Sequence, residues 1–91
     1  MIFDYYELES LQSGFLTIIV GCRFADEPDE LYVIQLDTLQ DGTVQELKLY
    51  FNGNDCKYTF KPDECALIKD YLVGELADSD YANWYQGGLK F

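Results

Sequence analysis

The sequence contains no histidine, the side chain that enzymes and metal sites use most often near neutral pH. Without it, neither a Ser-His-Asp triad nor a Cys-His pair can form. Paired carboxylates could still hydrolyse glycosides, but a chain of 91 residues has little room for a cleft that holds a sugar and raises the pKa of one carboxyl. The sequence therefore predicts a protein that is not an enzyme.

Motifs that would hold a metal ion or a cofactor are also missing. Cys22, Cys56 and Cys65 are odd in number and widely spaced, which suits neither a disulfide framework nor a zinc ribbon. Each falls on an apolar stripe, so we expect reduced thiols in the core. No glycine belongs to a phosphate-binding loop, and the acidic clusters 26–30 and 78–80 lack the glycine and distal glutamate of an EF-hand. We expect no cofactor and no metal.

Long hydrophobic runs are absent as well. The apolar segment 15–20 is far too short to span a bilayer. Met1 is followed by no basic segment of the kind that begins a signal peptide. We therefore expect a cytoplasmic protein.

Basic residues are few, with six against seventeen acidic residues and a formal net charge of −11. Such a charge repels phosphates, so the sequence excludes direct binding to nucleic acid and disfavours anionic membranes. The carboxylates extend from Asp4 to Asp80 and therefore belong to a folded surface. A charge of about two to eight is enough for the solubility of a small domain, so the excess predicts a positively charged partner.

Apolar residues, in contrast, are plentiful, at 48% of the chain, and aromatic residues make up 16%. This content can offset the entropy lost on folding, and the length supplies one core, so residues 1–91 should form a single acidic domain. Segments 14–24, 31–39, 44–51 and 56–61 alternate with the period of strands. An acidic loop at 25–30 and the turn pairs Asp41-Gly42 and Asn52-Gly53 separate them.

Helix signals follow in the second half of the chain. Pro62 at a first helical position, with Asp63 and Glu64 after it, predicts a helix from residue 62 to about 77 whose apolar stripe packs on the sheet. A short terminal helix is expected over 81–86. The first dozen residues fit either a short helix capped by Asp4 or a strand over 2–6, and we favour the helix.

The expected fold is α+β: a four-stranded antiparallel β-meander packed against a C-terminal helix, with a short terminal helix and a short N-terminal helix. Carboxylates in its loops and turns, joined by aromatic residues outside the core stripes, form the candidate partner-binding surface. The candidate residues are Asp26, Glu27, Asp29, Glu30, Asp41, Asp55, Asp78, Asp80, Tyr81, Trp84 and Tyr85.

Size, charge and fold class resemble those of the DNA-mimic and anti-defence proteins of phages, although no motif matches a particular family. The first hypothesis is therefore a small acidic inhibitor, anti-CRISPR or anti-restriction in type, that binds a basic nuclease or CRISPR effector subunit in the host cytoplasm. An immunity protein or antitoxin that neutralises a basic toxin nuclease would need the same surface. A third class is a non-inhibitory domain that forms a homodimer through an exposed sheet edge or a tyrosine-rich face, whereas an inhibitor can be a monomer or a homodimer.

Overall fold

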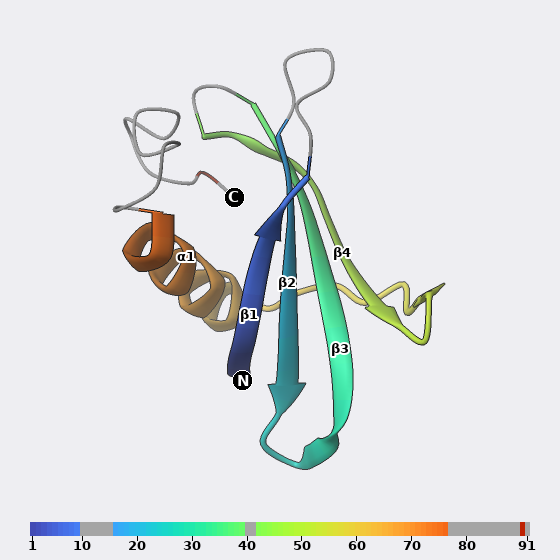
Figure 1. The fold of residues 1–91 in the computed structure, drawn as a ribbon. Coiled ribbons are helices and arrows are strands. Elements are labelled where there is room, and N and C mark those ends of the chain that lie inside the picture. The colour runs from blue at the N-terminus through green and yellow to red at the C-terminus, as the bar shows by residue number, and fades with distance from the viewer. Residues whose placement is uncertain (10–15, 40–41, 77–89, 91) are drawn as a thin grey trace.

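A computed structural model describes residues 1–9, 16–39, 42–76 and 90 (Figure 1). These residues form one helix and a five-stranded antiparallel sheet in which each strand pairs with its neighbour in sequence. The elements are β1 (Ile2–Leu8), β2 (Leu16–Phe24), β3 (Glu27–Thr38), β4 (Val44–Phe51), β5 (Asn54–Asp55) and α1 (Pro62–Leu76). The predicted α+β class, the antiparallel meander and the helix from Pro62 are confirmed.

The N-terminal segment is the strand β1, so the predicted N-terminal helix is wrong. A bulge between Phe3 and Tyr5 adds one residue to β1 where it pairs with β2. As a result Phe3 and Tyr6, three positions apart, both pack against the core. Asp4 and Glu7, whose spacing resembles a capping box and favoured the helix, are instead exposed residues of this strand.

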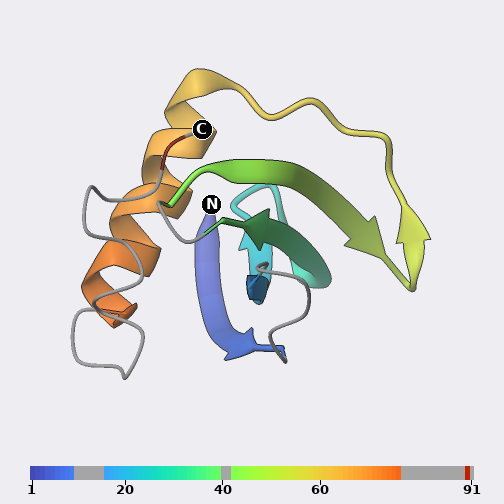
Figure 2. The same cartoon turned by 90° about the horizontal axis from the view of Figure 1, so that it is seen from above.

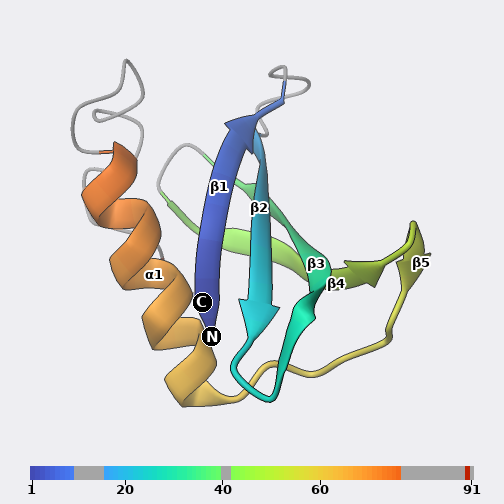
Figure 3. The ribbon, with the colours of Figure 1, turned by 60° about the horizontal axis from the view of Figure 1, so that its bottom comes forward.

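Residues 56–61 form no strand, so the predicted fourth strand is wrong. The two residues of β5 pair with β4 across Asn52 and Gly53, whose φ angles of 52° and 81° suit the predicted hairpin turn. Lys57 also has a positive φ, of 52°, and this left-handed backbone interrupts the extended chain. The segment then runs to the start of α1 (Figure 3).

The predicted acidic loop at 25–30 is mostly strand. Only Ala25 and Asp26 close the turn between β2 and β3, because Phe24 already pairs with Glu27. The register shifts after Cys22, so β3 bulges near Pro28, a position where a strand tolerates proline. The carboxylates of this segment are exposed, as expected.

The core lies between α1 and one face of the curved sheet, and Figure 2 shows α1 closing the open side of that curve. Its buried members are Leu16, Ile18, Val20, Cys22, Ile34, Leu36, Leu49, Ile68 and Leu72. Cys22 is buried as expected, but Cys65 is only partly buried and Cys56 is exposed. Val44 packs against the core because a register shift between β3 and β4 pairs it with the buried Thr38.

The opposite face of the sheet carries no helix within the described residues, and we call it the open sheet face. One row across it joins Tyr5, Gly21, Val33 and Tyr50, from four neighbouring strands. The Tyr5 ring lies over Gly21, since a Cβ added to that glycine would come within 2.1 Å of Tyr5 Cε1. The glycine therefore leaves the space that the tyrosine ring fills.

Candidate functional site

One end of the molecule gathers carboxylates from three parts of the chain. The start of β1, the β2–β3 hairpin and the start of α1 all lie there (Figures 1 and 3). The carboxylates are Asp4, Asp26, Glu27, Asp29, Glu30, Asp63 and Glu64, and we call this region the acidic end. All of these residues except the partly buried Glu64 are exposed.

Arg23 is the one arginine of the chain, and it is bound to a carboxylate within the acidic end. Its Nε and Nη2 donate to the two oxygens of Asp4, each over 2.9 Å, and its Nη1 donates to the Pro28 carbonyl over 3.3 Å. The hydrogen bond and charge of Asp4 raise the pKa of the guanidinium. Arg23 thus ties β1 to β2 and neutralises one carboxylate of the acidic end.

Glu64 joins the start of α1 to the preceding segment. Its Oε1 accepts a hydrogen bond from the Lys61 backbone N–H over 2.9 Å, which is half of a capping box. The Tyr58 hydroxyl donates to both Glu64 oxygens, over 2.7 and 2.8 Å. This hydrogen bond, with partial burial, raises the pKa of Tyr58 to about 12. Glu64 therefore stabilises the fold.

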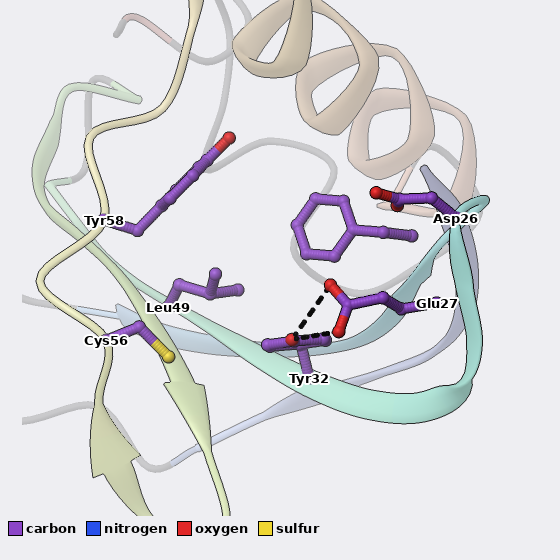
Figure 4. Close-up of a pocket in the computed structure, with 7 residues that line it drawn as sticks. Asp26, Glu27, Tyr32, Leu49, Cys56 and Tyr58 are labelled. Carbon is purple, nitrogen blue, oxygen red and sulfur yellow. Dashed lines mark hydrogen bonds between the residues drawn. The ribbon is translucent and has the colours of Figure 1, made fainter.

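A pocket of about 310 Å³ lies beside the hairpin (Figure 4). Three aromatic side chains from separate segments form much of its wall, and we call it the aromatic pocket. The Phe24 ring centroid lies 5.1 Å from that of Tyr32, at an interplanar angle of 79°, and 6.3 Å from that of Tyr58. The lining residues are Phe24, Asp26, Glu27, Tyr32, Leu49, Cys56 and Tyr58.

A carboxylate is held next to these rings. The Tyr32 hydroxyl donates to the Glu27 oxygens over 3.3 and 3.4 Å, so the Glu27 side chain lies across the edge of the pocket (Figure 4). Partial burial raises the pKa of Tyr32, and the Glu27 charge raises it further. The phenol therefore keeps its proton and remains a donor. Aromatic faces and negative charge meet in one concave site.

The structure brings together part of the predicted site. Asp26, Glu27, Asp29 and Glu30 all lie at the acidic end. Asp55 is exposed on β5, and its Oδ1 accepts a hydrogen bond from the Lys57 backbone N–H over 2.8 Å, so it organises a turn. Six predicted residues lie outside the described residues, as does the predicted helix over 81–86: Asp41, Asp78, Asp80, Tyr81, Trp84 and Tyr85.

Sequence reasoning missed the aromatic wall of the pocket. Phe24 lies on the core side of β2, and Tyr58 falls on the alternation that predicted a fourth strand, so both patterns indicate core residues. Both do pack, partly buried, against the core, and beside the acidic hairpin, where strand β2 ends, they also line the pocket. An aromatic residue at the end of a core stripe, directly before an acidic turn, is the signal that could have indicated this site.

The described residues offer little for covalent or metal chemistry. Burial raises the pKa of the Cys22 thiol to about 11, which keeps it protonated and unreactive at neutral pH. Among the described residues, no three cysteine, aspartate or glutamate side chains are grouped so that they could hold a metal ion. The described helix α1 is not long and apolar enough to cross a membrane.

Comparisons of the chain with protein-family models, with curated proteins and with solved structures find no match.

Proposed function

We propose that the protein is a small acidic inhibitor that binds a basic, nucleic-acid-binding surface of another protein. The observation that supports this function is the acidic end, where carboxylates of a hairpin, a strand and a helix start lie together. The partner is a nuclease or a CRISPR effector subunit, so the activity is anti-restriction or anti-CRISPR in type. An immunity protein against a toxin nuclease would use the same surface.

The physical basis is competition for lysine and arginine side chains. A protein that binds nucleic acid presents a basic surface to the phosphates, and carboxylates on a folded scaffold can occupy that surface instead. Asp26, Asp29 and Glu30 accept no hydrogen bond from the described residues and are exposed, so they are available to a partner. Electrostatic attraction of this kind speeds association and weakens as salt concentration rises.

The test is competition with labelled DNA for purified nucleases and CRISPR effector complexes, followed by fluorescence anisotropy over a salt series. The hairpin variant carries Asp26→Asn, Glu27→Gln, Asp29→Asn and Glu30→Gln. We expect the wild-type protein to displace DNA from one of these partners, and the hairpin variant to bind that partner at least about tenfold more weakly.

A control variant removes the same number of charges outside the acidic end, through Glu7→Gln, Glu46→Gln, Asp70→Asn and Glu75→Gln. It should lose much less affinity than the hairpin variant. Equal losses in the two variants, or displacement of DNA that does not depend on salt, would argue against the proposed surface.

The open sheet face favours a second candidate function, a non-inhibitory domain that forms a homodimer. Ile2, Tyr5 and Leu31 are exposed there to 42%, 37% and 48%. Apolar residues on an uncovered sheet face are typical of an association surface. Light scattering tests this function, because it requires twice the chain mass of 10.5 kDa, and Leu31→Thr should then restore the monomer. A monomeric wild-type protein excludes it.

A further inference from the structure

We propose that the aromatic pocket is the anchor site for an arginine side chain of the basic partner. This inference rests on the proposed function and adds to it the residue type that the protein recognises. The pocket opens within the acidic end, so the general attraction of the acidic end would guide a cationic side chain toward it.

The size of the pocket suits one side chain. Its 310 Å³ is at the lower end of the range of about 300 to 1,000 Å³ for small-molecule sites. A guanidinium group with its methylene stem fits such a space, and the apolar wall formed by Leu49 and the Phe24 ring matches the stem.

The geometry of the rings suits a cation. A cation is attracted to an aromatic face within about 6 Å of the ring centroid. The Phe24 centroid is 5.1 Å from that of Tyr32 and 6.3 Å from that of Tyr58, so one cation among them can lie within that distance of more than one ring. None of the seven lining residues is basic, so no lysine or arginine in the wall competes for the carboxylates there.

The carboxylates at the edge of the pocket favour an occupant that is positively charged and donates hydrogen bonds. Within the described residues, Glu27 receives only the two long contacts from Tyr32, of 3.3 and 3.4 Å, and a carboxylate has about four acceptor positions. It can therefore also accept hydrogen bonds from a guanidinium, with Asp26 beside it. An apolar side chain in the pocket would instead displace water from the Glu27 carboxylate without replacing the hydrogen bonds that the water makes.

Arginine fits this combination better than lysine. The guanidinium is planar, stacks on aromatic rings, binds a carboxylate through two parallel hydrogen bonds, and is more weakly hydrated than an ammonium group. Surfaces that bind nucleic acid present arginine for the same reason, since it recognises phosphate in this way. A partner of the proposed class thus offers the side chain that the pocket accepts.

The experiment is an NMR titration of the whole chain at fixed salt with capped tetra-arginine, tetra-lysine and tetra-citrulline peptides. Citrulline has the shape of arginine but no charge. We expect tetra-arginine to bind about fivefold more tightly than tetra-lysine, to shift the ring signals of Phe24 and Tyr32, and to bind where tetra-citrulline does not.

Three variants separate the pocket from the general charge of the protein. Glu27→Gln removes the carboxylate at the pocket and keeps every aromatic ring, whereas Phe24→Leu removes the central ring. Both should reduce the preference for arginine over lysine to less than about twofold. Glu46→Gln makes the same charge change on β4, away from the pocket, and should leave the preference unchanged. Glu27→Gln decides the question if Phe24→Leu fails to fold.

Equal binding of the arginine and lysine peptides, or a preference that survives Glu27→Gln, would overturn the arginine site. That failure is distinct from failure of the proposed function, because the DNA competition assay reports on the whole acidic end. Loss of DNA displacement in the hairpin variant, together with no arginine preference, would rule out the arginine site and leave the proposed inhibitor function in place. An arginine preference without any DNA displacement would support the arginine site and rule out the proposed inhibitor function.

Discussion

Five of the seven carboxylates at the acidic end divide into two groups. Asp4 is bound to Arg23, and Glu64 is bound to the Lys61 backbone and to Tyr58, so these two stabilise the fold. Asp26, Asp29 and Glu30 are exposed and accept no hydrogen bond from the described residues. The second group can be exchanged without loss of a hydrogen bond among the described residues. Of the four substitutions in the hairpin variant, only Glu27→Gln alters such a bond, the long contact from the Tyr32 hydroxyl.

The Tyr58 hydroxyl makes the free energy of unfolding fall as the pH rises in the alkaline range. Its pKa rises from the ordinary 10.0 to about 12 in the folded chain because it donates to Glu64. The unfolded chain loses this proton first, so the stabilisation is complete below pH 10 and is lost as the pH rises to 12. The Tyr58→Phe variant lacks this stabilisation, so the free energy of unfolding of the variant should fall less steeply between pH 10 and pH 12.

Urea denaturation at fixed pH values between 9 and 12 measures this difference. At neutral pH, Tyr58→Phe should cost about 1 kcal/mol, since a hydrogen bond to a charged group is lost at a partly exposed position. Cys22, whose pKa is about 11, titrates in both proteins, so its effect cancels in the comparison. Tyr50→Phe is the control for loss of a phenol elsewhere. If the free energy of unfolding fell equally steeply with pH in the wild type and in Tyr58→Phe, Tyr58 would not be the source of the alkaline pH dependence.

The elements that sequence analysis predicted correctly are those fixed by local chemistry. Pro62, followed by Asp63 and Glu64, marks the start of α1, and the Asn52-Gly53 pair supplies the positive φ angles of a tight turn. The wrong predictions depend on backbone features that no alternation reveals. Asp4, the expected helix cap, lies instead at the bulge of β1, and the left-handed Lys57 interrupts a segment whose alternation predicted a strand.

The packing of Tyr5 on Gly21 connects β1 to β2 on the open sheet face. A Cβ at residue 21 would lie 2.1 to 2.6 Å from three atoms of the Tyr5 ring, so Gly21→Ala must displace that ring. The ring can swing outward, and we expect a loss of about 1 kcal/mol in the free energy of unfolding. The Tyr5 ring signals in NMR spectra should move as well.

A double-mutant cycle tests whether this contact is the cause. In a Tyr5→Ala background, Gly21→Ala should be neutral or slightly stabilising, because the ring is gone and alanine restricts the unfolded chain more than glycine does. The same loss in both backgrounds would show that the methyl group disturbs something other than Tyr5.

Across the whole molecule, composition predicts a positively charged partner, but it does not predict which carboxylates and aromatic rings lie together on the surface. Part of the predicted surface, the carboxylates of 26–30, lies at the acidic end with the start of α1, although more than thirty residues separate them in sequence. The aromatic pocket needs the end of β2, the start of β3 and residues 56–58 together. Such a site exists only after folding, so no local pattern describes it.

The concentration of charge at one end has a measurable consequence for stability. At about 0.1 M salt the Debye length is ~10 Å, much shorter than the 35 Å long axis, so carboxylates of the acidic end repel one another more than they repel those elsewhere. Raising NaCl from about 20 to 500 mM should therefore increase Tm by a few degrees, through screening of this repulsion. Differential scanning calorimetry gives the value.

Two double variants with the same net charge separate local from overall repulsion. Asp26→Asn with Glu30→Gln, and Asp70→Asn with Glu75→Gln, each reduce the charge by two, from −11 to −9. Because Asp26 and Glu30 lie among other carboxylates, their removal should raise Tm at low salt more and should leave a smaller salt-dependent increase. Identical salt responses in the two variants would mean that overall charge, and not its concentration at the acidic end, limits stability.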